Sequence, residues 1–357
     1  MAKVLVVGSA ENGGGGITTV IKLIKKMPVW RKYGCKWLET QIQAGKAKKA
    51  YYAFRSYIVA LFSIWSYDIV HFHTVPNISM VVQLPIFLMA LVGRKKIILH
   101  LHVGNQLERE KEQNFKLFRW CMKKSDVIVL LAKKYIDVIK KNYAEICTPA
   151  TVIYNACENV NALPYVEHDK TILFAGIFSH NKAADKLILA FAKLHDKYPD
   201  WKLQLLGSGP DERAYRDLIA KYGLESCVQI PGYVTGEKKA SFFRKAGIYA
   251  MCSYLEGFPM VVLEAWAYGV PVVTTPVGGL PDVLEDGKNA CVFDFGDIEG
   301  LSAQLDKLMG DDNLRVEMGS YAKEMVEQVF SPIVISEQID VLYTQLLKSK
   351  YAKVSNR

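Results

Sequence analysis

The sequence predicts an α/β protein with two domains, each built around a parallel, doubly wound sheet. Its 357 residues suit about two domains, and half of them are hydrophobic, which is enough for two packed cores. Short β-branched runs alternate with helical patterns in both halves of the chain, as in sheets whose parallel strands are joined by helices. No internal repeat or low-complexity segment interrupts this alternation.

Cysteine usage and hydropathy predict a cytoplasmic protein. Seven cysteines, an odd number without a C-x-x-C pair, favour reduced thiols over a disulfide framework. Residues 75–93 carry no formal charge, but Pro76, Asn77 and Pro85 interrupt them and a strand follows at once. We therefore expect a buried loop and helix in this region, with a membrane-inserted segment as the alternative.

The first half begins with a strand over residues 3–8, a glycine loop, GSAENGGGGITTVI, and a helix. Glycines allow backbone N–H groups to approach a phosphate closely. The loop fits neither G-x-x-x-x-G-K-[ST] nor a clean G-x-G-x-x-G, so a turn that binds no ligand is the alternative.

Charge is unevenly distributed along the chain. Residues 1–150 hold 24 Lys and Arg against nine Asp and Glu, a net charge of +15, whereas residues 151–357 carry −6. This asymmetry predicts an anionic partner for the first half. Within residues 22–55 the cations alternate with Trp30, Trp37, Tyr51 and Tyr52, and an apolar stretch follows to Trp65, a mixture that suits an anionic membrane surface. A solvated helix face is the alternative, and nucleic acid is not expected, because no nucleic-acid-binding signature occurs.

Two strands of the first half end in histidines. The strand at 68–72 carries His71 and leads to His73, and the strand at 95–101 carries His100 and leads to His102. Ligands of doubly wound sheets bind beyond the carboxyl ends of strands. These histidines have no Cys, Asp or Glu at zinc-ligand spacing, so no metal site is expected. Strands at 127–131 and 151–154 complete the first domain.

The second half continues the alternation after a polar hinge at residues 160–169. Strands are expected at 171–175, 201–207, 248–252 and 270–274, and a strand and turn at 227–235. Helices are expected at 213–223, 239–245, 302–309, 314–326 and 331–348. We place one domain at 1–160, a second at 161–330 and a final helical segment at 331–357.

Residues 253–279 contain two glutamates, eight positions apart, around the start of a helix. Pro259 suits the first helical turn, so Glu256 precedes the helix and Glu264 lies inside it. The helix N-terminus offers an anion site formed by backbone N–H groups near Gly257, Phe258 and Met260. Glu264 falls in an apolar run, where a carboxylate must be hydrogen-bonded or paired. Ribose hydroxyls and the protein itself are both possible partners.

The run EGFPMVVLEAWAYGVPVVTT, followed by GGLPDVL, resembles the E-x7-E region of retaining, nucleotide-sugar-dependent glycosyltransferases of family 4. The resemblance covers most of residues 170–300 and extends to the first half in outline. It implies the GT-B fold, in which two Rossmann-like domains face a central cleft and a last helix crosses back to the first domain. It further implies transfer of a sugar from a UDP- or GDP-linked donor to a hydroxyl of a saccharide acceptor, with retention of configuration and without a metal or cofactor.

The resemblance also implies roles for individual residues. Glu256 would contact the hydroxyls of the donor sugar, Glu264 the nucleotide ribose and Lys182 the diphosphate. His102, with His100 as the competing choice, would face the donor sugar and acceptor. The remaining expected donor contacts come from the glycine loop, the helix start and the strand that frames the nucleobase, namely Gly15, Gly16, Gly257, Phe258, Pro259, Met260, Tyr233 and Val234.

One position departs from the family pattern. Ile177 stands where an arginine is usual, and Ala183 replaces a common glycine. A single cation, Lys182, is then left for the diphosphate. Either another residue, such as Lys186 or a lysine of the first domain, compensates, or donor affinity is reduced.

The basic first domain is the acceptor domain in the resembled family. We therefore expect an acceptor carried on a membrane lipid, as in surface-polysaccharide biosynthesis, and peripheral attachment to the inner face of the membrane. Two other functions stay open: a GT-B enzyme of different chemistry, such as a nucleotide-sugar 2-epimerase or a phosphorylase, and a catalytically silent protein that binds nucleotides or carbohydrates.

Overall fold

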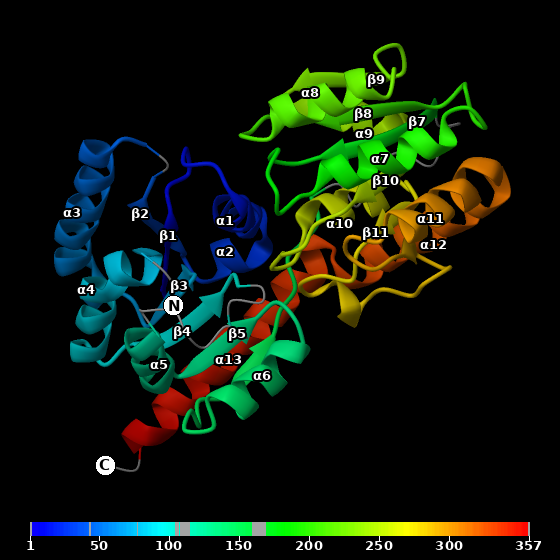
Figure 1. Cartoon of the computed structure of the whole chain (residues 1–357). Coiled ribbons are helices and arrows are strands. Elements are labelled where there is room, and N and C mark those ends of the chain that lie inside the picture. The colour runs from blue at the N-terminus through cyan, green and yellow to red at the C-terminus, as the bar shows by residue number, and fades with distance from the viewer. Residues whose placement is uncertain are drawn as a thin grey trace. The chain divides into compact units, whose positions relative to one another are not determined.

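The computed structural model describes residues 2–42, 44–76, 78–103, 107, 115–158 and 169–355, without the side chains of residues 115 and 349–355. The chain divides into two compact units (Figure 1). Unit 1 comprises Met1–Ala156 and Pro332–Arg357, and unit 2 comprises Cys157–Ser331. Apart from Asp169, the hinge predicted at 160–169 lies outside the described residues.

Unit 1 is built on a six-stranded sheet in the order β2-β1-β3-β4-β5-β6, and every pair of neighbours is parallel. The strands are β1 (Val4–Ser9), β2 (Lys36–Gln41), β3 (Ile69–Thr74), β4 (Lys96–Leu101), β5 (Val127–Leu130) and β6 (Ala150–Val152). Strands β1, β3 and β4 are buried almost throughout, as expected of a parallel sheet covered on both faces.

Helices cover both faces of this sheet. One face carries α1 (Gly16–Lys26), α2 (Pro28–Lys32) and α13 (Pro332–Ser355). The other carries α3 (Lys46–Ser63), the 3-10 turn η1 (Ile64–Ser66), α4 (Ile78–Val92) and α5 (Phe115–Lys124), while α6 (Lys134–Asn142) follows β5. The core on the second side joins Phe72 of β3 to Phe87 of α4 and Phe118 of α5.

The last helix, α13, is part of unit 1. The Asp340 carboxylate accepts from the Lys32 ammonium at 2.6 Å and from the Tyr33 hydroxyl at 2.7 Å. The Val29 N–H donates to the Ser336 hydroxyl at 3.1 Å. Three polar contacts therefore fix the C-terminal helix against α2 and the residue after it.

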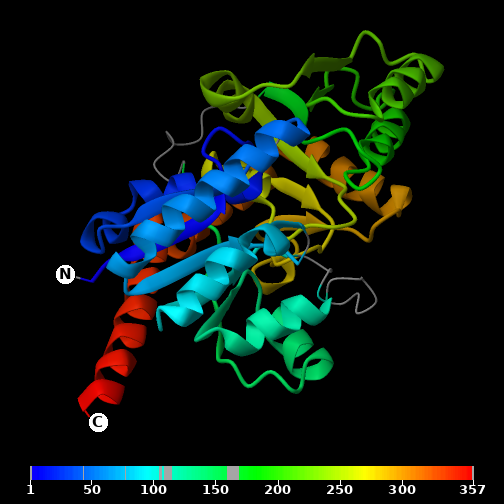
Figure 2. The ribbon, with the colours of Figure 1, turned by 90° about the vertical axis from the view of Figure 1, so that its left-hand side faces the viewer.

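Helices α3 and α4 lie next to each other (Figures 1 and 2), and each leaves large apolar side chains exposed. The Tyr57 hydroxyl joins the two helices by donating to the Val82 carbonyl at 2.9 Å. We call the exposed large apolar side chains of α3, η1 and α4 the α3–α4 surface; they are Tyr51, Phe54, Ile58, Val59, Leu61, Phe62, Trp65, Ile78, Val81, Leu88 and Val92. Most of them recur every three or four residues, and their exposure shows that these sides of the helices face away from the core.

This surface corrects two expectations from the sequence. The segment at 75–93 was expected to be buried, yet α4 exposes Ile78 and Val92 at 65% and 76%. The basic, aromatic segment at 22–55 is not one surface, because Trp30 lies in α2 and Trp37 in β2, both half-buried. Among the described residues, no helix is both long enough and apolar enough to cross a membrane.

Unit 2 contains a second parallel sheet of six strands, in the order β12-β11-β10-β7-β8-β9. The strands are β7 (Asp169–Ala175), β8 (Lys202–Leu206), β9 (Val228–Gly232), β10 (Ala246–Met251), β11 (Val272–Thr274) and β12 (Ala290–Val292). Numbered from β7, this is the 3-2-1-4-5-6 order of dinucleotide-binding folds, read from one edge. The prediction of two parallel, doubly wound sheets is confirmed.

The helices of unit 2 also divide between the two faces. α7 (Ala184–Leu194), α8 (Glu212–Lys221) and α11 (Ile298–Gly310) pack on one face, around Phe174, Phe191 and Trp201. α9 (Gly236–Lys245) and α10 (Met260–Ala267) pack on the other, and α12 (Asp312–Val329) contacts both α10 and α11. A 3-10 turn, η3 (Leu280–Asp282), follows β11.

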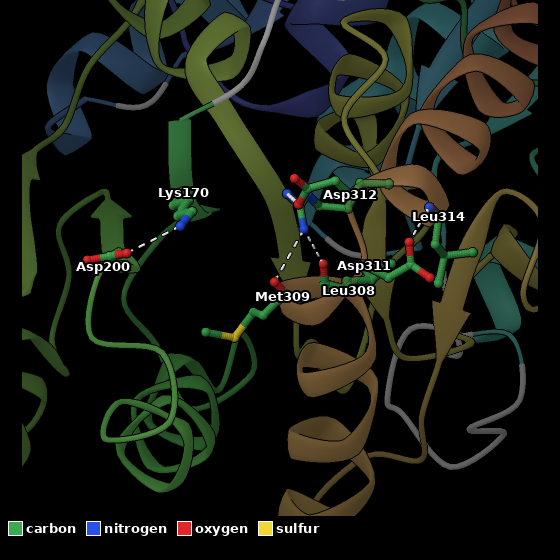
Figure 3. Close-up of polar contacts among 8 residues, drawn as sticks. Lys170, Asp200, Leu308, Met309, Asp311, Asp312 and Leu314 are labelled. Atoms are coloured by element: carbon green, nitrogen blue, oxygen red, sulfur yellow. Dashed lines mark hydrogen bonds and ion pairs between the residues drawn. The ribbon is translucent and has the colours of Figure 1, made fainter.

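A buried arginine, Arg315, joins α12 to the end of α11, where Figure 3 shows Leu308 and Met309. The Arg315 guanidinium donates to the carbonyls of Leu308 and Met309, which have no acceptor role within their own helix, and it stacks on Trp201 with its central carbon 5.1 Å from the ring centroid. Asp311 caps α12 by accepting from the Leu314 N–H at 2.9 Å. These contacts anchor the two helices to the core beneath them.

Candidate functional site

The topology of unit 2 marks one place at which a ligand is expected. Strands β7 and β10 are neighbours at the centre of the sheet, but α7 and α10, which follow them, pack on opposite faces. This reversal is the topological switch point, and doubly wound sheets bind ligands beyond the carboxyl ends of the strands there. Lys182 and Glu256, two of the predicted site residues, follow these two strands.

Three contacts tie the loop after β7 to the loop after β10. The Tyr254 N–H donates to the Asn181 carbonyl at 2.8 Å, and the Asn181 side-chain amide donates to the Leu255 carbonyl at 2.9 Å. The Lys182 ammonium forms an ion pair with the Glu256 carboxylate. Their side chains are only 20% and 15% exposed, so this pair is better shielded from water than an ordinary surface ion pair.

A second ion pair lies on the α9–α10 side of the same sheet. The Lys239 ammonium, in the first turn of α9, donates to the Glu264 carboxylate of α10 at 2.5 Å. Tyr249 of β10 feels the charge of both glutamates. Burial raises the pKa of its hydroxyl well above the ordinary value, and the charges of Glu256 and Glu264 raise it further. Both predicted glutamates therefore lie around Tyr249, and each has a lysine partner within unit 2.

The glycine turn after β11 supports the backbone of Glu256. Gly278 has φ +63°, and a Cβ there would lie 2.4 Å from the Gly257 carbonyl oxygen. The next residue, Gly279, donates its N–H to that same oxygen at 2.8 Å. Position 278 thus needs a residue that adopts a left-handed backbone conformation and has no Cβ. This explains the first glycine of the GG pair that follows the E-x7-E stretch.

The start of α10 agrees with the predicted anion site in its local geometry. Pro259 is the N-cap, with extended backbone, and the helix begins at Met260. Pro259 gives no side-chain cap, which leaves backbone donors at the positive end of the helix for a ligand. Of the predicted contacts, Phe258 and Pro259 are buried, whereas Gly257 and Met260 are half-buried.

The positions that depart from the family pattern have distinct environments. Ile177 is 65% exposed, so an arginine at this position has room without repacking. Lys186, one suggested compensating cation, is paired with Asp185 at 3.2 Å. Ala183 is the N-cap of α7 and has φ 46°, a left-handed conformation that disfavours residues with a Cβ. This strain is the physical reason for a glycine there in the resembled family.

Other predicted residues are less closely connected to these pairs. Tyr233 and Val234 follow β9, and Tyr233 is 77% exposed. The described contacts join neither of them to the two ion pairs. Lys239, in contrast, was missed by the sequence reasoning. It lies 25 residues before Glu264, and only the packing of α9 beside α10 brings the two together.

Unit 1 holds the predicted histidine, His102, within a group of four that we call the histidine array. β3 and β4 pair in register so that His73 lies opposite His100, and His71 and His102 extend the group on the same face. The Tyr343 hydroxyl of α13 meets His71 Nδ1 at 2.8 Å, and His71 Nε2 meets His100 Nδ1 at 3.3 Å. His73 Nδ1 meets His102 Nε2 at 2.9 Å. His100 and His102 thus belong to one assembly.

Burial determines the charge of the histidine array. His71, His73 and His100 are buried and His102 is half-buried. Burial is the largest cause that lowers the pKa of each ring below its ordinary value, and repulsion from neighbouring rings adds to it for the three buried ones. All four imidazoles are therefore neutral at pH 7.

The predicted glycine loop lies at the switch point of the unit 1 sheet. It follows β1, whose neighbour β3 leads to α4 on the opposite face from α1. Gly15 is the N-cap of α1, with φ 89°, and Gly16 begins the helix. Gly15 gives α1 no side-chain cap, so the loop has the local geometry of an anion site. Of the residues after β4, Gly104 and Asn105 lie outside the described ranges.

Comparisons with known proteins find a family that resembles the second half of the chain. Residues 158–325 match the model of the family described as "Glycosyl transferases group 1". A D-inositol 3-phosphate glycosyltransferase of Corynebacterium jeikeium is 35% identical over 184 residues, which are 50% of this chain and 44% of that protein. An N-acetyl-alpha-D-glucosaminyl L-malate synthase of Bacillus anthracis is 30% identical over 182 residues, 51% of this chain and 47% of that protein. The chain thus spans less than half the length of these relatives.

The fold has close structural counterparts. Anabaena HepE, solved in complex with UDP, superposes with a TM-score of 0.77 and 18% identity, over 96% of this chain and all of that one. Together with the family match, this likeness confirms the predicted GT-B class of fold. The resemblance to group 1 glycosyl transferases that the sequence predicted is therefore confirmed over residues 158–325, where the chain is similar to that family and to proteins named as glycosyltransferases.

Proposed function

We propose that the chain is a retaining glycosyltransferase that moves a sugar from a UDP- or GDP-linked donor to a hydroxyl of a saccharide acceptor. The observation that carries the proposal is the pair of lysine–glutamate contacts around Tyr249, at the switch point of unit 2. The match of residues 158–325 to the group 1 family supports the reaction class. The same two glutamates form the E-x7-E pattern of that resemblance.

Each member of these pairs has a chemical role in the proposal. Glu256 accepts hydrogen bonds from the hydroxyls of the donor sugar, and Glu264 accepts from the ribose. Lys182 and the backbone donors at the start of α10 stabilise the negative charge that builds up on the departing diphosphate. The transition state is oxocarbenium-like, as in other glycosyl transfers, and no metal takes part.

Lys239 is a candidate for the second cation that the diphosphate lacks at position 177. The usual second cation is absent at position 177, but Lys239 brings another ammonium group to Glu264 on α10. In the proposal, Lys239 supplies part of the positive potential for the nucleotide phosphates while it holds the Glu264 carboxylate in place. This assignment replaces Lys186, whose described ion pair is with Asp185 of its own helix and not with either predicted glutamate.

The test of the donor is a thermal-stability panel of nucleotide-sugars, because a ligand that binds only the native state raises its stability. UDP- and GDP-linked sugars are compared with ADP-linked ones at equal concentration. The stabilising donor is then incubated with and without acceptors, and the anomeric configuration of the product is read by NMR. A donor that is converted without an acceptor into an epimer indicates different chemistry, and stabilisation without turnover indicates a silent binding protein.

For the acceptor, we propose a saccharide on a membrane lipid, of the kind used in surface-polysaccharide biosynthesis, reached by peripheral attachment to an anionic inner leaflet. The α3–α4 surface supports this proposal, because its aromatic and aliphatic side chains face outward on adjacent helices. Exposed cations at the start of α3, Lys46, Lys48 and Lys49, lie beside it. Apolar insertion together with cation attraction is the combination that binds anionic membrane surfaces.

Co-sedimentation with vesicles tests the membrane proposal. We expect binding to anionic vesicles at low salt, weaker binding at high salt and little binding to neutral vesicles. Phe54→Ser with Phe62→Ser should abolish binding. Ile333→Ser with Val341→Ser, on exposed positions of α13, is the matched control and should leave it unchanged. Equal binding by both double variants, or none by the unaltered chain, contradicts the proposal.

A further inference from the structure

The hydrogen bonds of the histidine array have a direction that can be worked out from their chemistry. A neutral imidazole carries one N–H donor and one bare nitrogen acceptor, so a ring that accepts at one nitrogen must donate at the other. The array contains three described contacts, from Tyr343 to His71, from His71 to His100, and between His73 and His102. Two nitrogens, His73 Nε2 and His100 Nε2, are buried and have no hydrogen-bond partner among the described residues.

A shared metal ion is the first alternative to consider. His71, His73 and His100 have nitrogens within 4.8 Å of one another, which is close enough to suggest one. Imidazole lone pairs lie in the ring planes, however, and the three rings are inclined to one another by only 10° to 34°. Nearly parallel planes do not converge on one ion, and among the described residues no carboxylate joins the group to offset its charge. The geometry favours a hydrogen-bonded stack.

The direction of the first two bonds follows from Tyr343. Its hydroxyl is fully buried, and His71 Nδ1 is its described polar contact, so the hydroxyl proton is satisfied when it donates to that nitrogen. His71 then carries its proton on Nε2 and donates to His100 Nδ1. His100 in turn carries its proton on Nε2. The chain from α13 into the sheet therefore ends in an N–H at His100.

The direction of the hydrogen bond between His73 and His102 follows from the N–H at His100. His73 faces His100 across the strands, with ring centroids 4.7 Å apart, and the two partnerless nitrogens belong to these two rings. An N–H at both nitrogens would leave two buried donors unsatisfied, whereas an N–H at His100 and a bare nitrogen at His73 leave one. His73 Nε2 is therefore bare, and its proton lies on Nδ1, from which it donates to His102 Nε2.

We infer that the histidine array and Tyr343 fix His102 as a hydrogen-bond donor through Nδ1–H, so that His102 holds an oxygen atom of a sugar or phosphate rather than acting as a general base. His71, His73, His100 and Tyr343 are positioning residues, because they act through His102. This role rests on the proposed function, but the protonation pattern does not. The pattern is specific: Nε2–H for His71 and His100, and Nδ1–H for His73 and His102.

The experiment is a long-range ¹H–¹⁵N spectrum of histidine-labelled, tag-free protein at pH 7.5, in which each neutral ring reports its tautomer. Single His→Gln variants assign the rings. We expect two Nε2–H and two Nδ1–H rings in the array, distributed as stated. The inference is overturned if His102 carries its proton on Nε2, or if His73 and His102 have different tautomers. Stoichiometric zinc, nickel or copper in elemental analysis of the same sample also overturns it.

Tyr343→Phe tests the origin of the direction while keeping the aromatic packing. Loss of the hydroxyl should mix the tautomers of His71 and His100 and reduce the Nδ1–H population of His102. Tyr33→Phe is the matched control, because the Tyr33 ring contacts Tyr343 but its hydroxyl bonds Asp340 and Thr344. Unchanged tautomers in Tyr343→Phe contradict the inferred direction. These spectra need no substrate, so failure of the proposed transferase activity would leave their result intact.

Discussion

Glu256 and Glu264 have similar ion pairs but different proposed ligands, so the same substitution should affect them differently. Glu256→Gln removes an interaction that strengthens in the transition state, and kcat should fall about 100-fold with little change in the donor KM. Glu264→Gln removes a ground-state contact to ribose, and the donor KM should rise about tenfold. Steady-state kinetics with the best donor of the panel measure both. Near-normal kinetics in both variants would refute the assignment.

Ile177 offers a gain-of-function test at the same scale. Its side chain is 65% exposed, so Ile177→Arg should fold normally. An added charged hydrogen bond to the diphosphate is worth about 1.5–3 kcal/mol, so donor affinity should rise at least tenfold. Val316→Arg, at an exposed position of α12, controls for the added charge. Unchanged affinity would mean that Lys239 already fills this role, which Lys239→Ala in the Ile177→Arg background then checks by losing affinity.

At the scale of single elements, the turn after β11 separates backbone strain from steric fit. Gly278 and Gly287 both have positive φ, +63° and +78°, but a Cβ meets backbone at the first and open space at the second. Gly287→Ala should cost about 1 kcal/mol from the left-handed conformation alone. Gly278→Ala should cost at least 2 kcal/mol more and should also lower activity, because the clash displaces the backbone of Gly257 and Glu256. Urea unfolding of the two variants gives the difference, and equal losses would refute the supporting role.

The elements themselves were largely predictable from sequence. Alternation of β-branched runs with helical patterns identified most strands, and Pro259 with Gly269 bounded the helix that carries Glu264. The outward stripes of α3 and α4 were harder, because hydropathy records that a residue is apolar but not which side of a helix is covered. Ile78 and Val92 are exposed only because α4 is the outer layer of unit 1.

At the scale of the whole molecule, the contacts that sequence reasoning missed join residues far apart in the chain. His71 meets Tyr343 across 272 positions, and Lys239 meets Glu264 across 25. No local pattern encodes either contact; they follow from sheet register and from the return of α13 to unit 1. The same register brings together His100 and His102, the two choices that the sequence left open, since the pairing of β3 with β4 places four histidines in one group.

The histidine array also predicts how unit 1 responds to acid. An unfolded histidine titrates near pH 6.5, while burial lowers the pKa of His71, His73, His100 and His102 in the folded chain. Because the unfolded state binds these protons first, the contribution of the array to stability is fully present above about pH 6.5 and is lost as pH falls. Four such groups should reduce the free energy of unfolding by about 4 kcal/mol between pH 6.5 and 5.5, a range in which ordinary carboxylates stay ionised. That loss is comparable to the whole stability of a marginal domain.

Urea unfolding at pH 7.5, 6.5 and 5.5 measures this dependence, and hydrogen exchange in β3 and β4 assigns it to unit 1. Replacing one buried ring, as in His100→Gln, should reduce the slope of stability against pH by about a quarter, because one of four proton-binding sites of the unfolded state is removed. His180→Gln is the matched control, since His180 is exposed in unit 2 and lies outside the array. A stability that is flat from pH 7.5 to 5.5 would show that burial does not lower the pKa of these rings in the folded chain, and a slope that His180→Gln reduces as much as His100→Gln would show that the array is not its source.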